Sequence, residues 1–275
     1  MSPPPTNDSN RVVQSLWVGG ALSAMERLSI QSFLDHGHQF NLYTYDEVGR
    51  VPDGTTVLDA EQILPRDRIF RYRQDGFGKG SLSGFGNLFR LQLLHDIGGW
   101  WVDCDMVCVR PLDFEDPIVI ASSWEPKVLQ HRGVNNCALR FPPGHPAVAE
   151  ALHRFNQIDV DQMEFAEAGP VLLKQVVSSQ GLREHVVDWR CFCPIGYRDF
   201  EKMVQSPDLR SVARRVRRAW TGLPQVRVPQ QARCVHLWGN MWREAGLDKD
   251  GAYPPRSLYE RLKAKHFTPV DAGRG

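Results

Sequence analysis

The sequence predicts an α/β protein with a mostly parallel sheet flanked by helices and folded as a single domain. Short apolar, β-branched runs alternate with amphipathic helical runs along the first 110 residues, which is typical of parallel βαβ units. The 275 residues, 42% of them hydrophobic, suffice for one such core. We expect the domain to span 11–265, between a disordered N-terminal tail at 1–10 and a loose C-terminal tail at 266–275.

The first elements follow one another in βα order. Residues 11–18 mix β-branched and apolar side chains and stop at two glycines, which predicts a buried strand ending in a tight turn. Apolar residues near helical spacing predict a helix over 21–36. Alternation predicts strands at 40–45 and 56–58.

A helix that leads into a strand forms the centre of the chain. An apolar stripe over 81–97, closed by Gly98 and Gly99, predicts a helix with a left-handed stop. The aromatic and β-branched run at 100–109 predicts one buried strand directly after it. Further elements are expected as strands at 118–122, 136–141 and 234–238 and helices at 146–155 and 170–178, before an irregular end.

Composition excludes several classes of protein. With 33 Lys and Arg against 32 Asp and Glu, the chain has no overall basic character for nucleic acid. The sequence shows neither an export signal nor an apolar run long enough for a membrane span, so we expect a cytoplasmic protein. The six cysteines predict reduced core thiols. Cys191-x-Cys193 has no second pair of ligands at zinc-finger spacing, so we do not expect a zinc site there.

Asp103 and Asp105 are the strongest chemical signal. In an extended strand, side chains two residues apart point to the same side, so the two carboxylates should converge while Cys104 points away. Carboxylates are the ligands that Mg²⁺ or Mn²⁺ prefers, and such an ion can leave positions open for a diphosphate. The pair alone is a weak motif, but two acids among apolar residues need a cation or another ligand.

The segment 85–105 resembles the DXD region of family 32 glycosyltransferases and the related α-1,4-glycosyltransferases. That region has a helix with an acid or amide and an Arg, then a Gly-Gly turn, then an aromatic strand ending in D-x-D. The resemblance implies a GT-A-like, Rossmann-type fold. It also implies transfer of a sugar from a nucleotide-sugar donor, with a UDP-sugar favoured, to a glycan or glycolipid acceptor, with retention of configuration, as in bacterial capsular or lipopolysaccharide (polysaccharide) biosynthesis.

The resemblance also assigns roles to residues. It implies that Asp105 is the main ligand of a Mn²⁺ or Mg²⁺ ion, that Asp103 contacts the donor and the ion, and that His236 completes the metal shell. Arg90 would reach the sugar or diphosphate, which its planar donors suit, and joins Asp103 and Asp105 in the catalytic set. Asn87 stands where many relatives have Asp, and we assign it to donor hydroxyl binding.

Weaker landmarks of the same resemblance complete the expected site. The donor-binding residues are expected to be Trp17, Val18, Asn87, Arg90, Asp103, Cys104, Gly169 and Trp238. The acceptor or sugar is expected at Asn135, Asn136 and Trp242. Each assignment has a structural alternative: Arg90 could pair with Asp96, His236 could be a hydrogen-bonded core histidine, and the tryptophans could be core residues.

Other functions stay open from the sequence. A hydrophobic strand followed by Asp103-x-Asp105 also fits haloacid-dehalogenase-like phosphatases, in which Asp103 would be the nucleophile, although that motif normally opens the fold. A non-catalytic carbohydrate- or nucleotide-sugar-binding protein is left open by Asn87. Residues 210–220 form a basic amphipathic pattern that fits peripheral contact with an anionic membrane, a solvated helix or an anion-binding wall.

Overall fold

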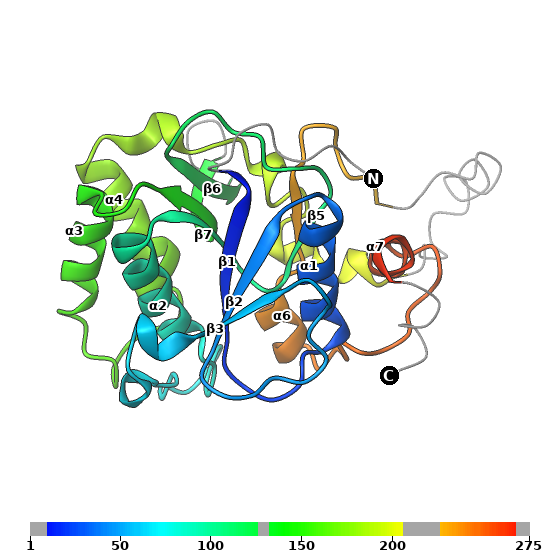
Figure 1. Ribbon diagram of the computed structural model, residues 1–275, viewed down its shortest axis with the longest axis horizontal. Helices are drawn as coiled ribbons and strands as arrows, with labels where there is room; N and C mark the ends of the chain where they lie inside the picture. Colours follow the sequence, from blue (N-terminus) through cyan, green and yellow to red (C-terminus); the bar gives the residue numbers. More distant parts are fainter. Residues whose placement is uncertain (1–9, 126–131, 206–225, 268–275) are drawn as a thin grey trace.

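The computed structural model describes residues 10–125, 132–205 and 226–267. Its centre is a six-stranded sheet in the order β3-β2-β1-β4-β7-β6, with a two-stranded sheet of β5 and β8 beside it. Helices lie on both faces of the large sheet (Figure 1). The expected α/β class, with a mostly parallel sheet flanked by helices, is confirmed.

The strands are β1 (Val12–Trp17), β2 (Gln39–Thr44), β3 (Thr56–Asp59), β4 (Gly99–Val102), β5 (Met106–Cys108), β6 (Val119–Trp124), β7 (Arg132–Phe141) and β8 (Cys234–His236). The helices are α1 (Ala24–Asp35), α2 (Ser83–Asp96), α3 (Pro146–Phe155), α4 (Leu172–Ser179), α6 (Gly239–Glu244) and α7 (Leu258–His266). Short helical turns are η2 (Ala60–Gln62), η3 (Arg66–Arg68), η5 (Glu167–Val171), η6 (Leu182–His185), η7 (Trp189–Cys191) and η8 (Tyr197–Met203).

The parallel half of the sheet brings several strand ends to one edge. β1 pairs in parallel with β2 and β4, and β2 pairs in parallel with β3. β7 then pairs antiparallel with β4 and β6. Because Val102 lies opposite Ala138, the first half of β7 runs past the end of β4. The carboxyl ends of β1 and β4 therefore share an edge with residues 132–137.

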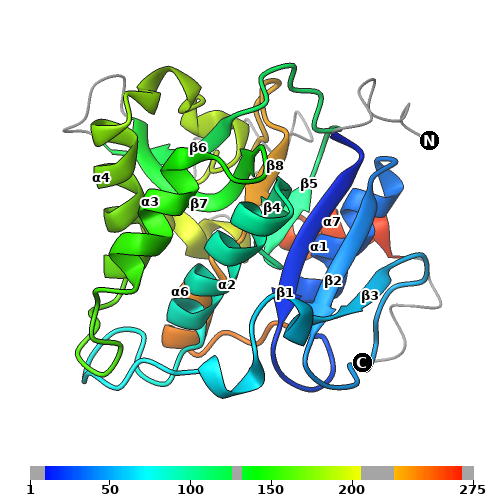
Figure 2. The ribbon, with the colours of Figure 1, turned by 60° about the vertical axis from the view of Figure 1, so that its left-hand side comes forward.

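Two apolar layers cover the sheet. The face under α2, α3 and α4 buries a cluster that includes Phe85, Phe89 and Trp101. The opposite face packs against α1 and β5 through a cluster that includes Phe33 and Trp100, and α6 and α7 pack beyond it. Figure 2 shows α2 and α3 in front of the sheet, with α1 and α7 behind it.

The predicted strand over 100–109 is wrong as a single element. β4 ends at Val102, the N–H of Met106 donates to the carbonyl of Asp103 at 3.0 Å, and the chain turns before β5 begins. β5 leaves the large sheet and pairs with β8 instead. A tight turn thus replaces extended backbone, so the two acids flank a bend.

The end of the chain is more regular than expected, because α6 and α7 follow β8. The basic segment predicted at 210–220 lies outside the described residues, as do 1–9 and 268–275. Within the described parts of the chain, no helix has both the length and the apolar character needed to cross a membrane.

Candidate functional site

The turn from Asp103 to Asp105 is fixed by the backbone of two neighbouring strands. The N–H of Asp103 donates to the carbonyl of Cys137 in β7 at 2.8 Å. The N–H of Leu237, just after β8, donates to the carbonyl of Asp105 at 2.9 Å. Both acids are therefore held at the carboxyl edge of the sheet, where open α/β sheets bind ligands.

Arg90 of α2 joins Asp103 to Asn87. Its Nη2 donates to Oδ1 of Asp103 at 2.5 Å, and its Nη1 donates to Oδ1 of Asn87 at 2.6 Å. Nε1 of Trp101 donates to the same Asp103 oxygen at 2.8 Å, and the guanidinium lies 4.9 Å from the centre of that indole ring. Arg90 is only 5% exposed. Its ion pair is with the partly buried carboxylate of Asp103 and not with Asp96.

Asn87 is held from two further directions. Nδ2 of Asn136 donates to Oδ1 of Asn87 at 2.9 Å. A Cβ on Gly169 would lie 2.8 Å from Nδ2 of Asn87 and 3.1 Å from Nδ2 of Asn136. The backbone of η5 therefore packs directly on the two amides, and only glycine leaves them room. These residues, with Arg90, line a small cavity between α2 and η5.

Asp105 faces the C-terminal part of the chain. The N–H of Gly239 donates to its Oδ2 at 2.6 Å, and Nε2 of His236 lies 3.3 Å from its Oδ1. Burial would raise the pKa of Asp105, but the charge of His236 and the Gly239 N–H lower it to about 2. Burial likewise opposes the positive charge of His236, yet the Asp105 carboxylate raises the pKa of His236 well above its usual range.

Asp103, Asp105 and His236 form a group that could hold a metal ion. Their nearest ligand atoms all lie within 4.8 Å of one another. Burial raises the pKa of Asp103 and the nearby Asp105 adds to the shift, although Arg90 lowers it. Oδ1 of Asp105 is buried without a hydrogen-bond partner among the described residues. Two carboxylates and an imidazole at this spacing fit a hard divalent cation.

The other nitrogen of His236 faces two thiols. Its Nδ1 lies 3.8 Å from Sγ of Cys193, which lies 3.6 Å from Sγ of Cys137. Cys137, Cys193 and His236 are all buried and form a second group that could hold a metal, with the softer ligands that zinc accepts. Cys191 is not part of it. The partner thiol comes from β7, so the spacing of Cys191 and Cys193 could not indicate it.

Aromatic rings flank the two acids. Trp17 ends β1 half-buried, its Nε1 donates to the carbonyl of Gly20 at 2.9 Å, and Val18 follows it half-buried. Trp238 lies over His236 with ring centres 3.9 Å apart and donates from Nε1 to the carbonyl of Ile195. Sγ of Cys104 lies 3.0 Å from Oγ of Ser15, so this thiol points toward β1 and away from the carboxylates.

Trp242, expected to contact the acceptor, lies buried away from the surface. Its side chain is 0% exposed and packs against Tyr253 and Tyr259, so it belongs to the core under α6. The Asn135 carboxamide is also buried, and its Oδ1 accepts from the N–H of Cys137 at 2.9 Å. Asn136, which contacts Asn87, is the one of these three that reaches the candidate site.

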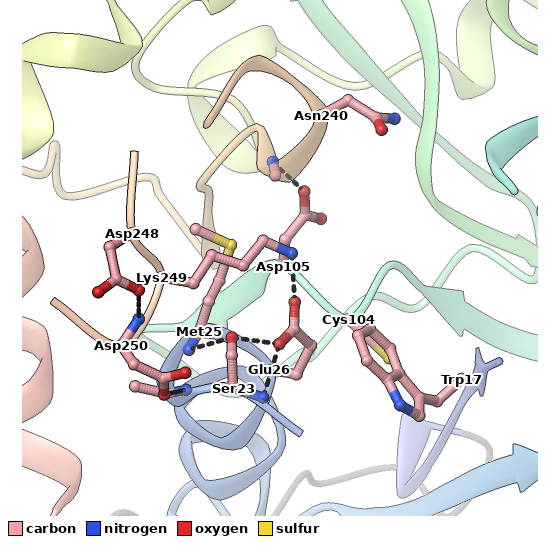
Figure 3. Close-up of polar contacts among 12 residues, drawn as sticks. Trp17, Ser23, Met25, Glu26, Cys104, Asp105, Asn240, Asp248, Lys249 and Asp250 are labelled. Atoms are coloured by element: carbon pink, nitrogen blue, oxygen red, sulfur yellow. Dashed lines mark hydrogen bonds and ion pairs between the residues drawn. The ribbon is translucent and has the colours of Figure 1, made fainter. Parts of the chain in front are cut away.

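Two charged residues beside Asp105 were not predicted from the sequence. Figure 3 shows the side chains of Lys249 and Glu26 converging next to it, with Trp17 across from them. Nζ of Lys249 lies 2.6 Å from Oε1 of Glu26. Ser23-x-x-Glu26 is visible in the sequence as a capping box for α1, but nothing in that motif indicates a buried site.

No protein-family model and no curated protein matches this sequence. Solved structures with a similar arrangement include the PaToxG glycosyltransferase, with 11% sequence identity, a TM-score of 0.44, and coverage of 93% of this chain and 85% of that one. A second is a transferase with 12% identity, a TM-score of 0.37, and coverage of 66% of this chain and 88% of that one. A variant of a transferase with two Cys-to-Ser changes is 14% identical with a TM-score of 0.37, over 63% of this chain and 86% of that one.

Proposed function

We propose that the protein is a metal-dependent glycosyltransferase that uses Mn²⁺ or Mg²⁺ and a nucleotide-sugar donor. The observation that carries this proposal is the group of Asp103, Asp105 and His236 at the carboxyl edge of the sheet, whose ligand atoms all lie within 4.8 Å of one another. Two acids and an imidazole at such an edge suit a cation that binds a diphosphate. A UDP-sugar is the favoured donor, and a glycan or glycolipid is the favoured acceptor.

Asp105 and His236 would hold the ion, and Asp103 would share it or contact the donor. When bound, the metal stabilises the negative charge that grows on the nucleoside diphosphate as the sugar leaves. The hydrogen bond from Gly239 fixes the Asp105 carboxylate, and the bonds from Arg90 and Trp101 fix Asp103. These side chains are therefore oriented before the ion and the donor arrive.

Arg90, Asn87 and Asn136 would form the side of the site that binds the donor sugar. Arg90 uses one N–H on Asp103 and one on Asn87, while its Nε is buried with no partner among the described residues. Gly169 keeps the backbone of η5 close enough to support both amides. Trp17, half-buried at the end of β1, offers a ring for stacking on the base.

Retention of configuration, a role in polysaccharide biosynthesis and a cytoplasmic location with peripheral membrane contact through 210–220 stay predictions of the sequence. A second candidate is a protein that binds nucleotide sugars without turning them over. The amide of Asn87 favours it, because the site then lacks a third carboxylate beside the sugar. A phosphatase, in which Asp103 would be the nucleophile, has no observation of its own in its favour, and Oδ1 of Asp103 accepts hydrogen bonds from Arg90 and Trp101.

The test is a thermal-shift screen of the purified protein against UDP, GDP and CMP and their sugars, each with and without Mn²⁺. A ligand that binds only the native state at 100 times its Kd adds about 2.7 kcal/mol of stability, which is a measurable shift. We expect one nucleotide to raise Tm only with the metal, and its sugar to be hydrolysed or transferred. Metal-dependent binding without turnover would favour the binding protein, and no shift with any nucleotide would refute the proposal.

A further inference from the structure

A partly buried ion pair beside Asp105 joins two residues that are far apart in the sequence, Glu26 and Lys249. Nζ of Lys249 is 2.6 Å from Oε1 of Glu26, and the two side chains are 29% and 2% exposed. Glu26 lies in the first turn of α1, while Lys249 lies in the loop between α6 and α7. The loop after α6 therefore delivers a cation to the edge of the candidate site (Figure 3).

The amine and the Asp105 carboxylate face a common space. A Cβ on Gly239 would stand 3.0 Å from Oδ2 of Asp105 and 3.5 Å from Nζ of Lys249. The lack of a side chain at Gly239 thus keeps the space between them open.

The ion pair with Glu26 uses one of the three N–H donors of Lys249. Oε2 of Glu26 already accepts from the N–H and the hydroxyl of Ser23, and Oε1 accepts from Lys249. An ammonium group has three N–H donors, and the bond to Glu26 is the one that Nζ makes to a described residue. Two donors remain at a partly exposed position.

Lys249 is paired with Glu26, but its amine still lies beside the proposed metal site. The positive charge of Lys249 repels a divalent cation held on Asp105 unless negative groups lie between them. A diphosphate bridging the two would satisfy both charges, and charge-assisted hydrogen bonds to phosphate are strong. The Glu26 carboxylate would then hold Nζ in place rather than compete for it.

We propose that Lys249 binds a phosphate oxygen of the nucleoside diphosphate, and that Glu26 is the positioning residue that holds its amine. This inference rests on the proposed function and adds a residue from the C-terminal loop to the donor site. It predicts that Lys249 contributes to the binding of diphosphates and not to the binding of the nucleoside.

The test is calorimetric titration of UDP and of uridine, with Mn²⁺, into wild type, Lys249→Met and Lys202→Met. Lys202 is the control, because it forms an ion pair with Asp199 at 2.5 Å on η8, outside the loop that carries Lys249. We expect Lys249→Met to weaken UDP binding about tenfold or more, the effect of one charge-assisted hydrogen bond. Uridine binding should change less than about twofold, and Lys202→Met should match wild type in both.

Two further variants separate the roles of the pair. Lys249→Arg should recover most of the UDP affinity, and Glu26→Gln should weaken UDP binding while leaving uridine binding unchanged. Lys249→Met leaves the buried Glu26 charged and could unfold for that reason. The double variant Glu26→Gln, Lys249→Met removes that charge, and its affinity for UDP is then measured in the same way. Wild-type affinity for UDP in a folded Lys249 variant overturns this inference alone, while a wild type that binds neither UDP nor GDP with Mn²⁺ overturns the proposed function as well.

Discussion

Nε2 of His236 lies 3.3 Å from Oδ1 of Asp105, and each residue shifts the other's acid–base equilibrium. Against the effect of burial, Asp105 raises the pKa of His236 well above 6.5, and His236 helps to lower the pKa of Asp105 to about 2. Both shifts favour the charged forms, an imidazolium beside a carboxylate. A metal ion that takes Nε2 as a ligand must displace that proton.

Mn²⁺ binding should release about one proton and strengthen as the pH rises through neutrality, by up to about tenfold per pH unit. The sign follows from the raised pKa of His236, because a protonated ring competes with the metal at lower pH. Titrations in buffers with different ionisation enthalpies measure the proton count. His236→Gln should bind Mn²⁺ more weakly and release almost no proton, and a pH-independent affinity in wild type would exclude His236 from the metal shell.

Arg90→Met should destabilise the fold by about 3–5 kcal/mol, because it leaves the partly buried Asp103 carboxylate without its charged partner. Urea unfolding with unchanged m-value measures this loss. In an Asp103→Asn background the same Arg90 substitution should cost clearly less, since no carboxylate is then left uncompensated. Equal costs in the two backgrounds would show that the pair is not coupled.

Gly169→Ala should disturb the donor side of the site more than the fold. The new methyl group would press on Nδ2 of Asn87, which Arg90 and Asn136 hold in place, so we expect about 1–3 kcal/mol of destabilisation and weaker donor binding. Gly86→Ala is the control: it lies in α2 beside Asn87, and its Cβ would meet nothing within 4 Å. That change should stabilise the helix by about 0.5–1 kcal/mol and leave donor binding intact. Identical behaviour of the two variants would contradict a supporting role for η5.

The parts of the fold with strong periodicity could be predicted from the sequence. The stripe ending at Gly98 and Gly99 gave α2 nearly to its bounds, and β1, β2 and β3 followed from alternation and turn residues. The turn at Asp103 could not be predicted, because the apolar run continues through it and the break depends on two hydrogen bonds, one that Asp103 donates to Cys137 and one that it accepts from Met106. Pairing of β5 with β8 is likewise a long-range choice that local pattern does not specify.

Some residues of the candidate site could likewise be predicted from the sequence and others could not. Asp103 and Asp105 are two residues apart, so their proximity could be predicted, and the structure brings them together in the turn after β4. The pairing of Arg90 with Asp103 was not predicted. The packing of Trp242 against Tyr253 and Tyr259 could not be predicted, because an aromatic residue near a site motif cannot be distinguished from a core residue until its neighbours are known. Lys249 was missed because the loop that carries it has no periodicity, and its partner Glu26 looks like an ordinary helix cap.

The most direct test of the account is the Mn²⁺-dependent release of nucleoside diphosphate from UDP-glucose, UDP-N-acetylglucosamine and GDP-mannose by wild type and by Asp105→Asn, with the exposed Asp96→Asn as control. The amide keeps the shape of Asp105 but removes the charge that would hold the ion. We predict activity on one donor in wild type and the control, with at least about 100-fold less in Asp105→Asn, because the metal supplies several kcal/mol of charge stabilisation. Unchanged turnover in Asp105→Asn, or wild-type turnover that persists without any divalent metal, would contradict the account.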